Sequence, residues 1–271
     1  MLKGIAASSG VAISKVYKLE RPVLVVNPNF SDVETELTVF NESLEKTKVD
    51  IEKVKTKAVG RLSDDELAIF DAHLMVASDP EFIGQIEEQI KNGSSVSAAV
   101  ESVKSMFVGM FEAMEDEYFR ERAADIKDVT YRLLAHTLNV KVPDLSLIDE
   151  EVIIVAYDLT PSDTAQLDRQ FVKGFATEIG GRTSHSAIMA RSLEIPAVVG
   201  IKGIMAHTNN DDVLILDALL GDVLVNPEKE VIDVYRNKEL EYAEYRESLK
   251  QLISAESQTV DGHRVELSGN I

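Results

Sequence analysis

The spacing of apolar residues changes twice along the chain, and these changes limit the secondary structure that each part can adopt. From Val33 to Ala58, apolar residues alternate at intervals of four and three, with Thr47 in the one polar position. This spacing predicts a long helix with a narrow apolar seam, and Ser31 with Glu34 fits a capping box at its start. Similar patterns predict further helices over 63–77, from 80 onward, over 98–114 and over 119–138. Residues 31–142 are therefore expected to form an all-α bundle of antiparallel helices.

On either side of this bundle, apolar residues fall in short β-branched runs. Val152–Ala156 is the most compact run, and others occur in the first 17 residues and over 197–200, 212–217 and 222–226. Helical stretches are expected between these strands, at about 161–170 and 184–193. The most economical arrangement is one discontinuous α/β domain, built from 1–22 and 144–227, with the bundle inserted into it.

The C-terminal part has two further patterns. Residues 228–257 are rich in Glu, Lys, Tyr and Leu with sparse apolar positions, which predicts a long linker helix. Residues 258–271 are typical of a hairpin that opens another domain. We therefore expect the chain to be a fragment of a longer protein.

The composition excludes several classes of function. The chain has no Cys, which removes disulfide scaffolds, thiolate catalysis and zinc–cysteine sites. Its formal net charge of −19 repels nucleic-acid phosphates and anionic membrane surfaces, and it favours a partner with a basic face. No apolar run approaches the length of a membrane helix and no signal peptide is recognisable, so a cytoplasmic protein is expected. No histidine or carboxylate pair has convincing metal-ligand spacing.

The segment over 178–191, EIGGRTSHSAIMAR, carries the residues best suited to chemistry. Its two glycines let the backbone approach a ligand closely, and Thr183 or Ser184 can cap a helix that begins there. His185 then lies in the first turn, where the helix dipole favours a neutral imidazole and the N–H groups can bind phosphate oxygens. Such a ring beside phosphate-binding donors suits a phosphoryl acceptor. These residues alone leave a second interpretation open, in which His185 makes a purely structural hydrogen bond.

GGRTSHSAIMAR resembles the phosphohistidine signature of the phosphoenolpyruvate-utilising enzymes. Further segments extend the resemblance over the whole chain, to the Enzyme I family of the bacterial sugar phosphotransferase system: GIAASSGVAI, DLTPSDTAQL, SLEIPAVVG and TVDGHRVELSGNI. The resemblance implies that His185 takes a phosphoryl group from phosphoenolpyruvate and passes it to a histidine of the small carrier HPr. It also implies that the Thr164 hydroxyl orients the imidazole. The phosphate site would be shaped by Gly180, Gly181, Arg182, Thr183 and Ser184.

The family has its carrier-binding surface on the helical insertion. The resemblance implies a surface of acids bordering an apolar strip: Asp64, Asp65, His73, Met75, Val76, Asp79, Glu81 and Arg122. The acids would steer a basic carrier, and the apolar centre would supply affinity. The residues themselves also allow 69–76 to be bundle core, His73 to be a partly buried bundle residue, and Arg122 to form an ordinary salt bridge.

The resemblance further implies a C-terminal barrel domain that this chain lacks, which binds phosphoenolpyruvate and Mg²⁺ and carries the dimer contacts. We therefore expect this chain to bind no metal and to be monomeric, whereas the full-length protein would be a homodimer. It would exchange phosphoryl groups with HPr without using phosphoenolpyruvate. The α/β domain is expected to swivel about segments near 22–30, 143–150 and 228–258.

Two other functions stay open. The phosphohistidine domain of a pyruvate phosphate dikinase or phosphoenolpyruvate synthase carries the same TSH signature, but there it follows an ATP-grasp domain rather than a helical insertion. A non-catalytic helical scaffold for a basic partner would account for the acids and leave GGRTSH unexplained.

Overall fold

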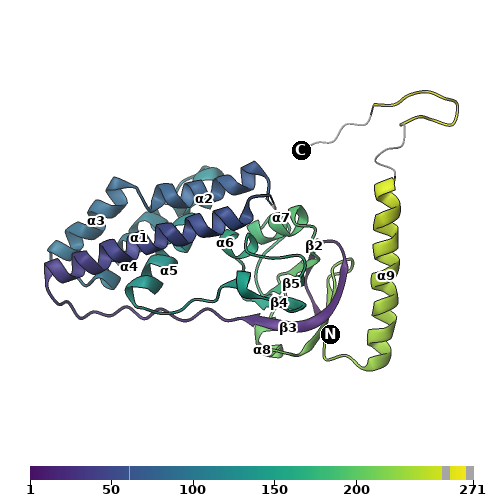
Figure 1. Ribbon diagram of the computed structural model, residues 1–271, viewed down its shortest axis with the longest axis horizontal. Coiled ribbons are helices and arrows are strands. Elements are labelled where there is room, and N and C mark those ends of the chain that lie inside the picture. Colours follow the sequence, from purple (N-terminus) through teal and green to yellow (C-terminus); the bar gives the residue numbers. More distant parts are fainter. Residues whose placement is uncertain (61, 252–256, 267–271) are drawn as a thin grey trace.

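The computed structural model describes residues 1–60, 62–251 and 257–266 (Figure 1). A bundle of long helices lies at one end, a mixed β-sheet with short helices forms the middle, and one long helix runs along the far side of the sheet. This is the α/β plus helical architecture that the apolar spacing predicts. Among the described helices, none is both long enough and apolar enough to cross a membrane.

The bundle consists of α1 (Val33–Ala58), α2 (Asp64–Val76), α3 (Pro80–Lys91), α4 (Val96–Glu112) and α5 (Glu117–Thr137). The predicted seam of α1 is buried from Phe40 onward. Thr47, its polar member, donates its hydroxyl to the carbonyl oxygen of Ser43 at 2.8 Å, so its burial leaves no donor unsatisfied. Val33 and Leu37 are only partly covered, because they lie at the open start of the helix.

The cap of α1 differs from the predicted pairing of Ser31 with Glu34. Asp32 is the N-cap, and its carboxylate accepts from the N–H three residues further on at 2.9 Å. Glu36 reaches back instead, accepting from the Ser31 N–H at 3.1 Å and from the Val96 N–H at 2.8 Å. The Glu36 carboxylate thereby joins the starts of α1 and α4, a contact that a local capping rule does not include.

The sheet combines strands from both sides of the bundle: β1 (Leu2–Lys3), β2 (Ile5–Ser8), β3 (Val11–Leu19), β4 (Val152–Ala156), β5 (Val172–Thr177), β6 (Ala197–Val199), β7 (Val213–Asp217) and β8 (Asp222–Val225). Their spatial order is β1-β8-β7-β3-β4-β5-β6-β2. β3 lies in the middle, parallel to β4 and antiparallel to β7. The bundle therefore interrupts the sequence of a single sheet.

Successive side chains of β4 point to opposite faces of the sheet, as expected for an extended strand. Ile154 belongs to an apolar cluster that continues into the bundle, whereas Ile153 and Val155 belong to a second cluster on the opposite face. That opposite face is covered by α8 (Ile204–His207). Because the first cluster runs through both parts, the sheet and the bundle share a continuous apolar core.

Two short helices and one 3₁₀ turn lie near the ends of β4 and β5: η1 (Leu145–Leu147), α6 (Pro161–Thr164) and α7 (His185–Ser192). The helix expected over 161–170 is therefore too long. α6 ends at Thr164 with Ala165 as its C-cap, and the next bonds reach back only three residues, from Leu167 N–H to the Thr164 carbonyl oxygen at 3.2 Å. A separate turn at Asp168, whose carbonyl oxygen accepts from the N–H of Val172 at 2.7 Å, then leads into β5. α7 matches the helix expected over 184–193.

The long C-terminal helix α9 (Lys229–Gln251) lies beside the sheet, on the side away from the bundle (Figure 1). Lys238 pairs with the buried Asp217 of β7, and Arg246 pairs with Glu194 at 2.8 Å. Most of its other side chains are exposed. The described part of the following segment, 257–266, makes a turn closed by a bridge between Gln258 and Arg264. Residues 252–256 and 267–271, within the predicted linker and hairpin, lie outside the described residues.

Candidate functional site

A cleft of 580 Å³ lies between the bundle and the carboxyl ends of β4 and β5. Ligands of α/β sheets commonly bind at this end of parallel strands. The loop after β4 leads into α6, and the loop after β5 leads into α7. Thr160 and His185 line the cleft from these loops, while Ile69 of α2 and Arg122 and Asp125 of α5 line it from the bundle. The cleft, which we call the interdomain cleft, therefore lies between the helical bundle and the sheet.

The loop between β5 and α7 is held in shape at both ends. Gly180 has φ of +116°, in the left-handed region that favours glycine. A Cβ at this position would lie 3.3 Å from Oγ of Ser184. From the last turn of α7, Arg191 donates to the carbonyl oxygens of Arg182 and Ala7, each at 3.1 Å. The loop therefore presents its residues to the cleft in a fixed conformation.

His185 is the first residue of α7, and Ser184 is the N-cap, as the motif predicts. The Ser184 hydroxyl makes no capping bond; it donates to the Gly181 carbonyl oxygen at 2.8 Å. The first turn thus has backbone N–H groups that its N-cap side chain does not satisfy, and such groups bind anions. The His185 ring is half-buried, with its Nε2 shielded from solvent. One helix start therefore combines a ring and anion-binding donors.

The residues predicted to shape a phosphate site fall into two groups. Gly180, Thr183 and Ser184 line the cleft together with His185. Gly181 and Arg182 belong to the same loop but lie outside the lining of the cleft, and the Arg182 side chain is exposed. Their contact with a phosphate stays a prediction.

Thr164, predicted to orient the imidazole, is the last residue of α6 and is fully buried. Its hydroxyl donates to the carbonyl oxygens of Pro161 at 2.9 Å and Thr160 at 3.2 Å. α6 does contact α7, but this hydroxyl proton is directed at the backbone of its own helix. An orienting role for the lone pairs of the same oxygen stays a prediction.

The start of α6 is fixed to the segment that enters the bundle. Thr160 and Asp163 form a reciprocal capping box. Arg21 pairs with the Asp163 carboxylate, donates to Oγ1 of Thr160 at 3.2 Å, and lies 5.3 Å from the centre of the Tyr131 ring of α5. Burial raises the pKa of Asp163, which the charge of Arg21 opposes. The guanidinium therefore ties α6 to the bundle.

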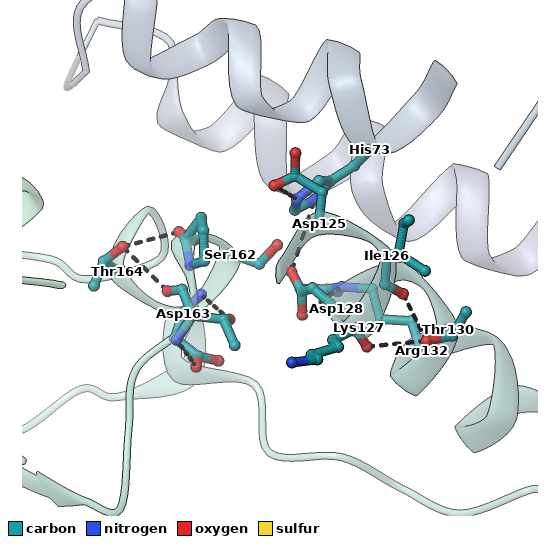
Figure 2. Close-up of polar contacts among 12 residues, drawn as sticks. His73, Asp125, Ile126, Lys127, Asp128, Thr130, Arg132, Ser162, Asp163 and Thr164 are labelled. Atoms are coloured by element: carbon teal, nitrogen blue, oxygen red, sulfur yellow. Dashed lines mark hydrogen bonds and ion pairs between the residues drawn. The ribbon is translucent and has the colours of Figure 1, made fainter. Parts of the chain in front are cut away.

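A buried chain of charged groups lies on the bundle side of the cleft (Figure 2). Nε2 of His73 lies 3.2 Å from Oδ1 of Asp125, and Nη1 of Arg122 donates to Oδ2 of the same carboxylate at 3.0 Å. His73 has no exposed area. The predicted position of His73 on a partner-binding surface is therefore wrong, because its ring points inward to carboxylates of α5.

Asp128 continues this chain toward α6. Its carboxylate lies 3.7 Å from Nδ1 of His73 and 3.9 Å from Nε of Arg132, and Figure 2 shows the Ser162 side chain of α6 facing it. Burial alone would raise the pKa of Asp128, but the charges of Arg132 and His73 outweigh this effect and lower it. Asp128 is therefore held ionised in the interior, at the boundary of the two domains.

We expect an Asp128→Asn variant to lose about 3 kcal/mol of unfolding free energy at neutral pH, because it leaves buried cations without their counter-charge. A carboxyl with a lowered folded-state pKa stabilises the fold above its unfolded-state pKa, and this contribution disappears as pH falls through the folded-state pKa. The difference from the wild type should therefore shrink below about pH 4. Chemical denaturation across pH measures it.

The matched control is Asp50→Asn, since Asp50 forms a partly exposed pair with His136 at 2.8 Å, outside the buried network. Its removal should cost less than about 1 kcal/mol. Equal losses for the two variants at neutral pH would contradict a special role for the buried network.

A second hollow, of 570 Å³, adjoins the cleft on the bundle surface, and we call it the α2–α5 groove. Met75, Val76, Asp79 and Arg122 of the predicted partner surface line it. Met75 is 73% exposed, while Val76 is partly packed against the core. The groove is mainly apolar and includes aromatic side chains of α4, Phe107 and Phe111. Its composition suits a protein partner with an apolar patch.

Of the predicted acids with described side chains, Asp79 lines this groove, whereas Asp64 and Glu81 do not. Asp79 is exposed, and its carboxylate also caps α3 by accepting from the Phe82 N–H at 2.8 Å. Glu81 accepts from the Gln85 amide at 2.9 Å and is exposed, as is Asp64. The side chain of Asp65 lies outside the described residues. Contact of any of these acids with a partner stays a prediction.

Sequence reasoning missed several residues of the site. Asp125 lies one helical turn after Arg122, a spacing that favours an ion pair and could have identified it. Arg191 closes the quoted motif, and two turns of helix bring it back to the loop. Asp158, the first residue of the quoted DLTPSDTAQL segment, was given no role, but it lines the cleft, where burial raises its pKa. Within the described part of the chain, no cluster of three or more His, Asp or Glu could hold a metal ion.

Two family models match the chain. "PEP-utilising enzyme, N-terminal" matches residues 3–122, and "PEP-utilising enzyme, mobile domain" matches residues 148–221. The phosphoenolpyruvate-protein phosphotransferases of Staphylococcus carnosus (strain TM300) and Bacillus subtilis (strain 168) are 51% and 50% identical to it over 272 residues. Each alignment covers 100% of this chain and 48% of the relative, so the chain spans about half the length of these relatives.

Solved structures are similar over nearly the same range. A solution structure of an Enzyme I protein (nEIt) has a TM-score of 0.81 and 44% identity, covering 90% of this chain and 100% of that one. The N-terminal domain of Enzyme 1 - Nitrogen has a TM-score of 0.61 and 26% identity, covering 88% of this chain and 98% of that one.

Proposed function

The chain belongs to the phosphoenolpyruvate-utilising enzyme family, with relatives named phosphoenolpyruvate-protein phosphotransferase, and from this membership we propose that it exchanges a phosphoryl group between His185 and the carrier HPr. The observation that carries the proposal is the place of His185. It lies at a helix start in the interdomain cleft, directly beside the α2–α5 groove. A carrier docked in the groove would face this ring.

The transfer is a direct exchange between two imidazoles. A nitrogen lone pair of His185 attacks the phosphorus of phosphorylated HPr, and the new N–P bond forms as the bond to the carrier ring breaks. The electron pair of that bond stays on the carrier ring, and the proton that the attacking ring loses balances the one that the leaving ring gains. Because the protein contributes little covalent help, positioning and charge stabilisation dominate.

The helix start supplies both of these effects. The N–H groups of the first turn of α7 are aimed at the anion, and the loop fixed by Gly180 and Arg191 holds them in place. Thr183 and Ser184 add hydroxyl groups that line the same cleft. Donors that are in place before the reaction stabilise charge without reorganising.

We assign the α2–α5 groove to HPr. Met75 and the aromatic side chains of α4 provide an apolar centre, which the exposed Asp79 borders. The exposed Asp64 of α2 and Glu81 of α3 add negative charge to the bundle outside the lining of the groove. A carrier with an apolar patch ringed by basic residues complements such a surface, and the acids would raise the rate of encounter. α9, held to the sheet by Lys238 and Arg246, would act as the linker to the remainder of the longer protein.

A pyruvate phosphate dikinase or phosphoenolpyruvate synthase is the less favoured alternative. The N-terminal family model covers β1–β3 and most of the bundle, and the relatives named above match over the whole chain, helical insertion included. A non-catalytic scaffold is less favoured for another reason. It would require neither the fixed loop at Gly180 nor a histidine at the start of α7.

Phosphoenolpyruvate and Mg²⁺ are assigned to a part of the longer protein that this chain does not span, since it covers 48% of its curated relatives. We expect incubation with phosphorylated HPr to add one acid-labile phosphoryl group to this chain. Incubation with phosphoenolpyruvate and Mg²⁺ alone should add none. Intact-mass spectrometry at neutral and acidic pH distinguishes these results, and labelling by phosphoenolpyruvate and Mg²⁺ alone would contradict the assignment.

A further inference from the structure

Arg122 and Asp125 lie where the two hollows of the molecule meet. Among the described residues around these hollows, only these two line both the interdomain cleft and the α2–α5 groove. Within the same described lining, Arg122 is also the one permanently cationic side chain. A group that passes from the groove to His185 therefore passes this guanidinium.

A phosphoryl group needs such a cation here. The chain carries a net charge of −19, and the carboxylates of Asp125 and Asp158 line the cleft. Their field opposes the entry of a dianionic group, and the helix start of α7 provides partial charges only. A guanidinium carries a full positive charge and planar N–H donors, so it can neutralise a phosphoryl group more completely than the partial charges of a helix start.

The guanidinium is held in place by a chain of buried groups. Oδ2 of Asp125 accepts from Nη1 of Arg122 at 3.0 Å, and Oδ1 of Asp125 lies 3.2 Å from Nε2 of His73. Because each carboxylate oxygen has its own partner, rotation of the Asp125 side chain would break a contact. His73 is in turn fixed by Asp128, 3.7 Å from its Nδ1, and by the edge of the Phe70 ring.

We infer that Asp125 and His73 are positioning residues for phosphoryl transfer, which hold the Arg122 guanidinium where it neutralises the phosphoryl group between HPr and His185. The inference rests on the proposed function, and it gives the buried histidine of α2 a role through Arg122 instead of through direct contact with the carrier. It also explains why a histidine on an apolar helix faces two carboxylates, where leucine would fill the space without needing partners.

The test is the single-turnover rate of transfer from phosphorylated HPr to this chain, measured at saturating carrier, together with the Kd for unphosphorylated HPr. Arg122→Gln should lower the rate by about 100-fold, as loss of a charge-stabilising donor does. Asp125→Asn should lower it by about 10-fold while its Kd stays within about 3-fold of the wild type, because Asp125 is only 8% exposed in the lining of the groove and Asn has nearly the same shape. The double variant should be no slower than Arg122→Gln alone, since the two residues act in series.

His73 is tested by a pair of variants. His73→Gln can keep an N–H donor toward Asp125 and should retain most of the rate, whereas His73→Leu removes the donor and should match Asp125→Asn. Thermal unfolding of each variant shows whether it is folded. If a His73 variant does not fold, the comparison of the single and double variants of Arg122 and Asp125 still tests the inference. Lys127→Gln is the matched control, because it removes a cation of the same helix that pairs with Glu112 on the surface.

Each outcome decides between the claims. A wild type that accepts no phosphoryl group overturns the proposed function and this inference with it. A wild type that transfers normally, with Arg122→Gln equally fast, overturns the role of the guanidinium alone. A slow Arg122→Gln beside an unaffected Asp125→Asn, or rate losses that multiply in the double variant, overturns the positioning role of Asp125.

Discussion

A His185→Ala variant is expected to accept no phosphoryl group from phosphorylated HPr, under conditions where the wild type is fully modified. The variant keeps the fold, because the ring is half-buried at a helix start and alanine is a good helix former. It removes the one side chain of this helix start that has a nitrogen lone pair. The loss is therefore complete rather than partial, since the remaining N–H groups can bind phosphate but cannot form a bond to it.

The matched control is His207→Ala. His207 is exposed at the end of α8, where its Nδ1 lies 2.7 Å from the Gly203 carbonyl oxygen, on the face of the sheet opposite the bundle. This variant should be modified like the wild type. A His185→Ala protein that is folded by circular dichroism and still gains an acid-labile group would show that another residue is the acceptor.

A Met75→Asp variant is expected to weaken the binding of HPr by about 30-fold or more, the effect of losing a central interface residue. Met75 is 73% exposed and lines the α2–α5 groove, so the substitution places a charge in the apolar centre of the surface while the bundle core stays intact. A carboxylate there must lose its hydration when a partner with an apolar patch docks, which costs free energy. Isothermal titration calorimetry with unphosphorylated HPr measures the change in Kd.

Met110→Asp is the control for Met75→Asp. Met110 is 50% exposed on α4 and lies outside the lining of the groove. The substitution makes the same change of charge and shape on a neighbouring helix, so its Kd should stay within about 3-fold of the wild type. Equal weakening by both variants would indicate a general effect of charge, and no weakening by either would remove the groove as the docking surface.

Regular patterns in the sequence predicted the architecture because they depend on short-range geometry. The four-and-three spacing predicted the buried seam of α1, and the β-branched run predicted β4. The GGRTSH motif predicted that His185 begins a helix, since the glycines and hydroxyls that end a strand and cap a helix are adjacent in the chain. In each case the residues that decide the structure lie within a few positions of one another.

The parts that were not predicted depend on contacts between distant residues. His73 was assigned to the partner surface from the family resemblance, and nothing near it in sequence identifies Asp125, 52 positions away, as its partner. Glu36 joins the start of α1 to Val96 across 60 positions. The length of α6 was overestimated because its capping box marks a start, whereas the helix ends at Thr164, where the bonds that follow reach back only three residues.

The cleft also depends on contacts between residues that are distant in sequence, so local patterns did not predict it. It exists because the bundle packs against the carboxyl ends of β4 and β5, and its lining comes from α2, α5 and two loops of the α/β domain. Arg122 could be assigned to a surface from its sequence context, but its place between two hollows follows only from the packing of α5. Sequence reasoning therefore predicted that His185 begins a helix beside Thr183 and Ser184, and missed Asp125 and Asp158 of the cleft lining.

Localisation of the phosphoryl group tests the central claim most directly. Trypsin cleaves after Arg182 and Arg191, so it releases residues 183–191, which contain His185 and no other histidine. After incubation of the wild type with phosphorylated HPr, digestion and fragmentation mass spectrometry under alkaline conditions should place one phosphoryl group on His185 of this peptide. A phosphoryl group on another histidine, or an acid-stable group on Thr183, Ser184 or Ser186, would contradict the account.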